Sequence, residues 1–408
     1  MRYLCAPDSF KESLTAAEAA RAMAEGIRRG DPDAEIRCLP MADGGEGTAR
    51  ALADATGGTM LTASAHDPLG RPVQAGFALL GDGRTAIVET AAASGLALLR
   101  PSERDPKATT SYGTGELIRA ALDAGAETII VGLGGSATND AGCGLLQALG
   151  VRLLDHDGRD VRPGGAALAE VERVDLSGLD RRLGDVHVIA ACDVTNPLTG
   201  PEGASAVFGP QKGASREDVT LLDGALRHVS SVIERALVEQ VPAERNGDGG
   251  KVEAAVAESS SPDHRTRTPI ADHPGAGAAG GIGMALLAVL HADFRPGIDL
   301  VIEQSGLDAA AQWADIVFTG EGSIDAQTMF GKTPVGVASV AKRHGKPVIA
   351  VAGHVGDGIE CLHGRGIDAV FGAAPGAASL DELLRDARAN VARTAEQVTR
   401  LMRIVRSH

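Results

Sequence analysis

Two segments near the amino terminus combine glycine with acidic, hydroxyl and basic side chains directly after a short apolar run. The first, APDSFKESL, spans residues 6–14, and the second, ADGGEGT, spans residues 42–48. Glycine lets a ligand approach the backbone, and paired carboxylates supply the hard oxygen ligands that divalent cations prefer. The two segments therefore indicate an enzyme that handles a phosphate group together with a metal ion.

Five further loops combine glycine with a carboxylate, an amide or a hydroxyl group. They are GGSATNDAG at 134–142, CDVTNPLTGPEGAS at 192–205, FGPQKGAS at 208–215, PGAGAAGGIG at 274–283 and GEGSIDAQT at 320–328. The first loop carries four such side chains: Ser136, Thr138, Asn139 and Asp140. Capping of the following helix accounts for one or two of them, and we expect an anion bound at the helix start to use the others.

Each loop also has an ordinary structural explanation, since glycine-rich turns follow strands throughout α/β folds. Asp8 suits a turn-capping role, and Asp43 with Glu46 suits the acidic start of a helix. Asp193 suits an Asx turn, and Glu321 suits helix capping. The lysines are solvated by default: Lys11, Lys212 and Lys332. The recurrence of the pattern in many loops nevertheless favours a function for some of them.

Alternating apolar runs and helical periodicity predict the elements that position these loops. The predicted strands span 2–6, 36–41, 128–133, 186–191 and 316–319. The first helix begins at Thr15, where Glu18 completes a capping box. This alternation is typical of an α/β fold with a parallel or mixed sheet. Such sheets bind ligands beyond the carboxyl ends of their strands, where the loops lie.

The composition is that of a large aliphatic protein. The 408 residues exceed the usual size of one domain and indicate two packed lobes. Hydrophobic residues make up 44% of the chain but aromatic residues only 2%, so aliphatic side chains fill the core. The formal charge of -15 would repel nucleic acid and anionic membranes. We therefore expect a small-molecule substrate and neither of those partners.

The cysteines and the amino-terminal sequence bear on the compartment. Cys5, Cys38, Cys143, Cys192 and Cys361 are odd in number and show no CxxC spacing. This argues against a disulfide framework and a zinc site, and favours a reducing cytoplasm. Asp8 comes too early for a signal peptide, and no apolar run approaches the about 18 residues of a membrane span.

A dinucleotide-binding fold is the main alternative. The sequence GLGGSA at 132–137 spells GxGxxA after a predicted strand, and Asp155 follows about twenty residues later. A second GxGxxG, at 275–280, does not follow a strand. This alternative predicts an NAD(P)-dependent hydroxy-acid dehydrogenase. Because Asp140 would oppose a diphosphate in the absence of a cation, metal-assisted phosphoryl transfer accommodates the loop better.

One segment departs from the strand and helix pattern. Residues 243–273 are rich in Ser, Glu, Asp, Arg and Gly, and carry almost no bulky apolar residue after Val256. We interpret this segment as a mobile surface insert that tolerates deletion. A non-catalytic sensor of a hydroxy acid or a nucleotide would carry an output module. The insert has no helix or strand periodicity, which disfavours that third reading.

Eight motifs, in order, resemble those of the type-1 glycerate kinases from one end of the chain to the other. They are APDSFKESL at 6–14, ADGGEGT at 42–48, TSYGTGELI at 110–118, GGSATNDAG at 134–142, CDVTNPL at 192–198, FGPQKGAS at 208–215, PGAGAAGG at 274–281 and TGEGSID at 319–325. Only the insert at 243–273 departs from the family pattern, and it leaves the motifs untouched.

The resemblance implies ATP-dependent phosphorylation of D-glycerate, giving 2-phosphoglycerate, in glycolate or glyoxylate metabolism. It also implies a Rossmann-like or flavodoxin-like parallel-sheet domain, which we place at 1–60 and 284–408, and an inserted second α/β domain at 61–283. The residues leave open the product isomer, the stereoselectivity, competing hydroxy acids and the oligomeric state.

Phosphoryl transfer requires positive charge near the transferred group, a divalent cation and a proton acceptor. We predict that Lys11 stabilises the transition-state charge. Asp193 is the predicted base, because partial burial at a strand end would raise its affinity for a proton. Asp8 is the rival for that role.

The other predicted roles concern ligand binding. The residues predicted to bind the nucleotide phosphates of ATP are Gly134, Gly135, Ser136, Asn139, Gly277 and Gly280. Those predicted to bind the glycerate carboxylate are Thr110, Ser111 and Thr114. Those predicted to hold Mg²⁺, with waters and phosphate oxygens completing its shell, are Asp43, Glu46 and Glu321.

Overall fold

In the computed structural model, the described residues are 1–239, 268–329 and 332–406. The chain divides into two compact units. Unit 1 comprises Met1–Leu61, Gly76–Glu89 and Arg295–His408, and unit 2 comprises Thr62–Ala75 and Thr90–Phe294. Of the expected insert at 243–273, residues 243–267 lie outside the described residues, and residues 268–273 are described.

Unit 1 is built around a five-stranded parallel sheet in the order β13-β12-β11-β1-β2. The strands are β1 (Arg2–Cys5), β2 (Glu35–Cys38), β11 (Ile316–Ile324), β12 (Val348–Val355) and β13 (Ala369–Gly372). Because all five run in the same direction, the loops that follow β1 and β2 lie at the same edge of the sheet. That edge is where ligands bind in open parallel sheets.

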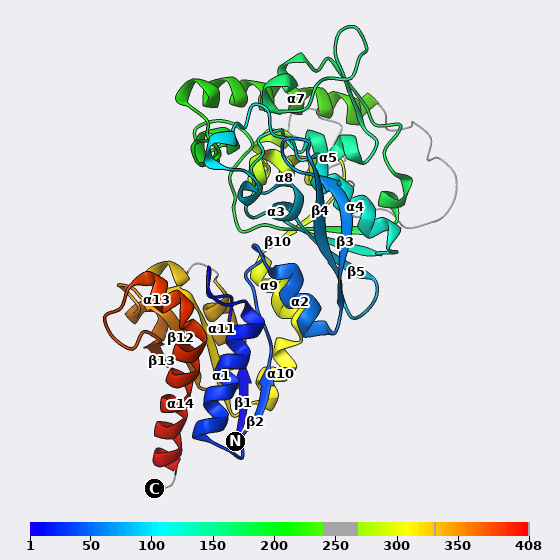
Figure 1. Ribbon diagram of the computed structural model, residues 1–408. Coiled ribbons are helices and arrows are strands. Elements are labelled where there is room, and N and C mark those ends of the chain that lie inside the picture. Colours follow the sequence, from blue (N-terminus) through cyan, green and yellow to red (C-terminus); the bar gives the residue numbers. More distant parts are fainter. Residues whose placement is uncertain (240–267, 330–331, 407–408) are drawn as a thin grey trace. The chain divides into compact units, whose positions relative to one another are not determined.

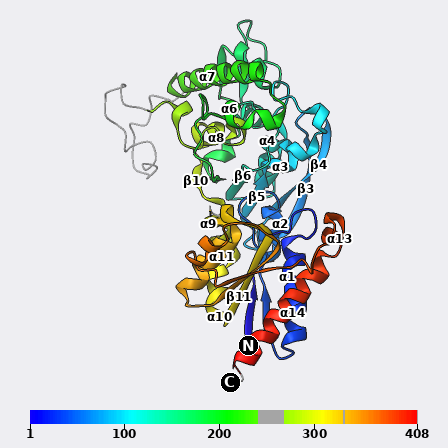
Figure 2. The same cartoon turned by 90° about the vertical axis from the view of Figure 1, so that its left-hand side faces the viewer.

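Helices cover both faces of this sheet. Figure 2 shows α10 (Leu307–Trp313) and α11 (Thr333–Arg343) on one side of β11, with α1 (Ala16–Gly30) and α14 (Ala387–Arg406) on the other. The last two helices come from opposite ends of the chain and run side by side (Figure 1). Their backbones approach closely at Gly26, where a Cβ atom would lie 1.9 Å from the carbonyl oxygen of Ala392.

The core between this helix pair and the sheet is mostly aliphatic, with the aromatic rings of Tyr3, Phe10 and Phe318 among its buried side chains. It contains Tyr3, Cys5, Met23, Ile27, Phe318, Val351 and Val391. Thr15 caps α1 in a reciprocal box with Glu18, which confirms the predicted helix start. The other helices of unit 1 are α2 (Thr48–Thr56), α9 (Gly297–Ser305), α12 (Glu360–His363) and α13 (Leu380–Arg385).

Unit 2 contains the parallel pair β6 (Thr128–Gly132) and β9 (His187–Ala191), with β10 (Asp293–Arg295) beside β9. A separate antiparallel pair is formed by β7 (Arg152–Leu154) and β8 (Arg173–Asp175). The strands β3 (Thr59–His66), β4 (Pro72–Leu79) and β5 (Thr85–Glu89) pair side by side in that order. The division into units runs through β3 and β4 and leaves β5 in unit 1. The helices are α3 (Thr90–Ser94), α4 (Tyr112–Asp123), α5 (Cys143–Ala148), α6 (Ala204–Phe208), α7 (Arg216–Glu239) and α8 (Ala278–Ala288).

The α/β fold class is confirmed, and two strand predictions are wrong at their ends. The strand predicted at 36–41 ends at Cys38. The strand predicted at 316–319 continues to Ile324, because its backbone stays paired with β12 through Glu321↔Ala352 and Ile324↔Val355. Glu321 therefore lies inside a strand and not in a loop. None of the described helices is long and apolar enough to cross a membrane.

Candidate active site

Asp8 lies three residues after β1, and its carboxylate accepts hydrogen bonds from the next residue in the chain and from the first residue of α11. The Thr333 hydroxyl donates to Asp8 Oδ2 at 2.6 Å, and the Ser9 backbone N–H donates to Oδ1 at 2.5 Å. Burial raises the pKa of the Asp8 carboxyl to about 6, and the negative charge of Asp43 adds to this rise. The two hydrogen bonds act against it. Asp8 therefore ionises close to neutral pH.

Glu321 is a second acid with a raised affinity for protons in unit 1. It is buried in β11, where the Thr328 hydroxyl donates to its Oε1 at 2.7 Å and Lys332 Nζ lies 3.7 Å from the same oxygen. Burial is the main cause of the raised pKa of Glu321, and the charges of Asp8 and Asp43 contribute. Three carboxylates thus influence one another at the carboxyl ends of β1 and β2 and within β11.

The other residues predicted for this region are more accessible. Asp43 is half-buried, and its Oδ1 accepts a hydrogen bond from the Gly45 N–H at 3.1 Å. Glu46 is exposed, and its charge contributes to the raised pKa of Glu89, which is due mainly to burial. Lys11 is exposed in the loop after β1. The charge of Asp43 therefore affects the pKa values of Asp8 and Glu321, whereas the charge of Glu46 affects the pKa of Glu89.

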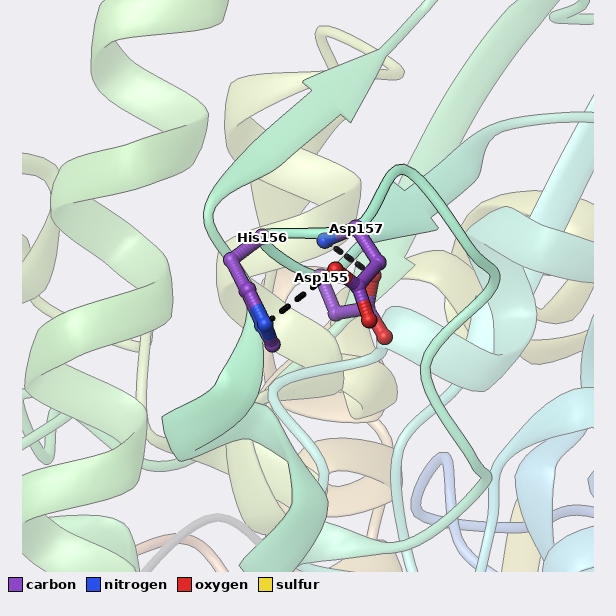
Figure 3. Close-up of side chains that lie close together, drawn as sticks. All are labelled: Asp155, His156 and Asp157. Carbon is purple, nitrogen blue, oxygen red and sulfur yellow. Dashed lines mark hydrogen bonds and ion pairs between the residues drawn. The ribbon is translucent and has the colours of Figure 1, made fainter.

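The predicted magnesium ligands do not converge to a ready-made coordination shell. Within the described residues, one group of three potential ligands has its ligand atoms within 4.8 Å of one another, and it consists of Asp155, His156 and Asp157 (Figure 3). Asp155 Oδ1 accepts the backbone N–H groups of Asp157 and Arg159, both at 2.9 Å, in an exposed turn after β7. Turn formation explains this cluster, including the acid that the dehydrogenase alternative singled out.

In unit 2, Asp140 organises the glycine loop that follows β6. It is 1% exposed, and its Oδ2 accepts hydrogen bonds from the Ser111 N–H at 2.8 Å, the Ser111 hydroxyl at 2.9 Å and the Gly144 N–H at 3.2 Å. The Gly142 N–H donates to Oδ1 at 3.2 Å. Burial raises the pKa of Asp140, and these hydrogen bonds oppose the rise.

The start of α5 is closed by the protein itself. The N–H of Cys143 donates to the Asp140 carbonyl, that of Gly144 to the Asp140 carboxylate and that of Leu145 to the Ser111 hydroxyl at 2.9 Å. These are the amides that an anion at this helix start would use. The structure assigns them to Asp140 and Ser111, so the expected anion would have to displace internal hydrogen bonds.

Lys212 is the largest departure from the sequence-based expectation in this unit. The predicted default was a solvated lysine, and this is wrong: the side chain is 2% exposed. Its Nζ donates to Ser136 Oγ at 2.9 Å and to the Thr138 carbonyl at 2.7 Å. Burial lowers the pKa of the Lys212 ammonium to about 7, and the negative charge of Asp140 acts against this. Lys212 thereby ties the motif FGPQKGAS to the loop GGSATNDAG.

Two other buried side chains of this loop are incompletely satisfied. Asn139 Nδ2 donates to Ser205 Oγ at 2.9 Å, but its Oδ1 finds no hydrogen-bond partner among the described residues. The Thr138 hydroxyl also has none within that part of the chain. Both residues are 0% exposed. Buried polar atoms without partners are costly, so they mark positions where a ligand or water would be stabilising.

Gly277 and Gly280, predicted to cradle phosphate, pack against other backbone segments of unit 2. A Cβ atom at Gly280, which has φ +71, would lie 1.9 Å from the Thr138 carbonyl oxygen. At Gly277 it would lie 2.1 Å from the carbonyl oxygen of Pro197. The Ala141 N–H donates to the Gly280 carbonyl at 3.1 Å. Close backbone packing therefore explains both glycines without a ligand.

The remaining predicted residues of unit 2 fall into buried and exposed sets. Thr110, Ser111 and Thr114 are buried, and the Thr114 hydroxyl donates to Ser94 Oγ at 2.7 Å. Gly134 and Gly135, in contrast, are exposed at the start of their loop. Asp193 is exposed as well. The partial burial that we expected to raise its proton affinity is absent, because the chain after β9 leaves the sheet immediately.

Sequence reasoning missed several polar partners of these residues. Thr333 and Thr328 bind Asp8 and Glu321, and Ser205 binds Asn139. A signal existed for Thr333, since it precedes a proline at the start of α11, where hydroxyl residues are common. A cavity of about 240 Å³ in unit 1 contains no motif residue and is lined by Phe371, Arg393, Thr394, Gln397, Val398 and Leu401.

Comparisons with known proteins give a consistent result over the full chain. Residues 3–403 match the model of the glycerate kinase family. The glycerate kinase of Bacillus subtilis (strain 168) is 47% identical over 407 residues, covering 100% of this chain and 99% of that protein. The glycerate 2-kinase of Escherichia coli (strain K12) is 45% identical over 404 residues, covering 99% and 98%. A crystal structure described as glycerate kinase 2 from Salmonella typhimurium LT2 is 46% identical, covers 100% of this chain and 99% of its own, and has a TM-score of 0.84.

Proposed function

The chain belongs to the glycerate kinase family, and on this premise we propose that it transfers the γ-phosphoryl group of ATP to D-glycerate. We propose 2-phosphoglycerate as the product, which is supported by the full-length similarity to the Escherichia coli protein named glycerate 2-kinase. The observation that carries the chemistry is the mutual influence of Asp8, Asp43 and Glu321 in unit 1. Acids with perturbed proton affinity mark functional sites.

This group of acids fits a magnesium ion. Burial is the main cause of the raised pKa values of Asp8 and Glu321 and the charge of Asp43 adds to both, so a divalent cation beside these carboxylates would offset the cost of ionising them. Mg²⁺ in kinases is held by one or two carboxylates together with substrate phosphates, so three converging protein ligands are not required. We assign Asp43 and Glu321 to this role. When bound, the ion would supply charge neutralisation at the phosphate oxygens.

Asp8 is the better candidate for the proton acceptor, with Asp193 as the alternative. A general base works best when its pKa lies near the operating pH, and that of Asp8 is raised to about 6. The Thr333 hydroxyl fixes the orientation of its Oδ2. Asp8 would accept the proton of the glycerate hydroxyl, while Lys11 in the same loop would approach the transferred group with its positive charge.

In unit 2, we assign the exposed amides of Gly134 and Gly135 to nucleotide phosphate. Lys212 then acts as a positioning residue, because its two hydrogen bonds fix the same loop at Ser136 and Thr138. The partnerless Oδ1 atom of Asn139 accepts hydrogen bonds, so it would bind a donor group of a ligand and not a phosphate oxygen. The hydroxyls of Ser111 and Thr110 donate to Asp140 Oδ2 at 2.9 and 3.5 Å, and that of Thr114 donates to Ser94 Oγ, so binding of the glycerate carboxylate by any of these hydroxyls would displace an internal hydrogen bond.

The experiment that tests this function measures ADP release with ATP, Mg²⁺ and D-glycerate, followed by proton-coupled phosphorus NMR of the product. An ester at position 2 couples to one methine proton and gives a doublet, whereas an ester at position 3 couples to two methylene protons and gives a triplet. We expect turnover that requires both Mg²⁺ and D-glycerate, with a doublet. A triplet would refute the product, and absence of glycerate-dependent ADP release would refute the substrate. The Asp8→Asn variant, prepared identically, controls for contaminating kinases.

A further inference from the structure

Two cysteines end neighbouring strands of unit 1. Cys5 is the last residue of β1 and Cys38 the last residue of β2, and the two are register partners in the parallel pair. Neighbouring strands lie about 4.8 Å apart. This separation falls inside the range of about 4.4 to 6.8 Å that a disulfide requires between Cα atoms. All five cysteines of the chain are free.

The two thiols are neighbours, and their surroundings differ. Cys5 is fully buried, whereas Cys38 is exposed and its thiol donates to the Ala20 carbonyl of α1 at 3.5 Å. The neighbouring Cys5 thiol, with the positive charges of Arg28 and Arg21 on α1, lowers the pKa of the Cys38 thiol to about 7. The Cys38 thiol, together with burial, raises the pKa of Cys5. An exposed thiolate beside a second thiol is the arrangement of redox-active cysteine pairs.

We propose that Cys38 and Cys5 form a reversible oxidation site, in which a hydroperoxide converts the two register-paired thiols into a disulfide. The proposal rests on their register pairing at the ends of β1 and β2 and on the exposure of Cys38 beside the buried Cys5. It is consistent with a reducing compartment, since intracellular disulfides are usually transient.

The reaction balances with the hydroperoxide as the oxidant. The thiolate of Cys38 attacks one peroxide oxygen, the O–O bond breaks, and the departing oxygen takes a proton to leave as water or an alcohol. Cys38 is then a sulfenic acid. The sulfur of Cys5 attacks the sulfur of Cys38, the S–O bond breaks, and the leaving hydroxide takes the Cys5 proton to become water. Two thiols lose two electrons and two protons, and the hydroperoxide receives them.

The position of the pair gives the oxidation a consequence. β1 leads to Asp8 three residues after Cys5, and β2 leads to Asp43 five residues after Cys38. β2 is the edge strand of the sheet, so it is paired on one side and shifts more easily than an inner strand. A bond between the strand ends would fix β2 to β1 and restrict the loop that follows β2. The expected result, which rests on the proposed function, is a loss of kinase turnover.

The test exposes the full-length protein to hydrogen peroxide, blocks the remaining thiols with N-ethylmaleimide and measures intact mass and cross-linked peptides. We expect a loss of two hydrogens within one chain, a linked Cys5–Cys38 peptide, and a turnover at least tenfold lower that dithiothreitol restores. The Cys38→Ser variant should lose this linkage, whereas Cys361→Ser, which removes another exposed cysteine of unit 1, should keep it.

Three results would overturn the proposal. They are oxygen addition to Cys38 with no linkage, linkage to a different cysteine, and a Cys5–Cys38 bond that leaves turnover unchanged. The mass measurement does not require that glycerate be the substrate. A protein that forms the bond but phosphorylates nothing would therefore count against the proposed function and not against the oxidation site.

Discussion

In unit 1, Asp8 and Asp43 follow neighbouring parallel strands and remain partly accessible, and the charge of Asp43 adds to the burial that raises the pKa values of Asp8 and Glu321. In unit 2, Asp140 follows β6 in a loop of similar composition, yet it is 1% exposed and accepts hydrogen bonds from its own loop and from Ser111. The first arrangement keeps carboxylate oxygens available, whereas the second uses them to build the loop.

This difference shows that a glycine loop with an acid does not by itself define a chemical role. What separates the two regions is how many backbone amides reach one carboxylate: three donate to Asp140, whereas one donates to Asp8 and one to Asp43. In unit 2 the acid closes the start of α5, and the close packing of Gly280 on Thr138 holds the loop in place. In unit 1 the acids sit at a sheet edge, and hydroxyl groups orient them from one side.

The largest expected effect is on turnover when Asp8 is replaced. We expect Asp8→Asn to lower kcat by about 10²- to 10⁴-fold, since a positioned general base contributes about that much. Asp193→Asn should lower kcat less than tenfold. Because burial raises the pKa of Asp8, the ionised carboxylate costs stability above pH 6, so thermal unfolding of Asp8→Asn at pH 8 should not move to a lower temperature. Equal losses of kcat in the two variants would contradict the assignment.

The next effect concerns the packing that distinguishes unit 2. Gly280→Ala places a Cβ atom 1.9 Å from the Thr138 carbonyl oxygen, whereas Gly125→Ala meets nothing within 4 Å. Both glycines have positive φ, so both variants carry the backbone cost of about 1 to 2 kcal/mol. We expect the free energy of unfolding of Gly280→Ala to fall by a further 1 to 3 kcal/mol or so, because overpacking adds about that much. Equal urea midpoints for Gly280→Ala and Gly125→Ala would show that the loop around Thr138 shifts to accommodate the added methyl group.

A third effect tests the buried ammonium of Lys212. Its pKa in the folded chain is about 7, below the ordinary value of 10.5, so between these values the unfolded chain holds a proton that the folded chain has released. Stability therefore rises with pH across that window, by at most about 1.4 kcal/mol per pH unit. Between pH 7 and 10, we therefore expect the free energy of unfolding of the unaltered protein to increase relative to that of Lys212→Met. If the difference between the two free energies of unfolding did not change with pH, Lys212 would have to be a solvated side chain, contrary to the structure.

The smallest expected effect comes from Thr333. Its hydroxyl lowers the pKa of Asp8 by donating to Oδ2 at 2.6 Å, so Thr333→Val should move the acidic limb of the pH–rate profile above about pH 6. At pH 8, where Asp8 stays ionised, kcat should change only slightly. Thr328→Val, which removes the hydrogen bond to Glu321 instead, is the matched control and should leave that limb in place. A shift in both variants would indicate a general effect on the sheet edge.

Local sequence signals predicted the parts of the fold that depend on neighbours in the chain. The capping box at Thr15 is an example, because its partner Glu18 lies three residues further along the chain. The burial of Lys212 depends on Ser136 and Thr138, which lie more than 70 residues away. The extension of β11 through Glu321 likewise depends on pairing with β12. Contacts at such separation leave no local pattern.

The candidate site divides in the same way. The acids of unit 1 were identified because each follows a strand or a glycine, and strand ends meet at one sheet edge. The sequence favoured Asp193 over Asp8 as the base, because the end of an apolar strand suggested partial burial there. Their difference arises from what packs around them: α11 supplies Thr333 to Asp8, whereas Asp193 is exposed.

The most direct test of the account is the pH dependence of kcat for the unaltered protein, at saturating ATP, Mg²⁺ and D-glycerate. The account predicts that kcat falls about tenfold per pH unit below a midpoint near 6, where Asp8 takes up a proton, and reaches a plateau above it. A profile that stays flat through pH 6, or a midpoint that persists in the residual activity of Asp8→Asn, would contradict the role of Asp8 as the proton acceptor.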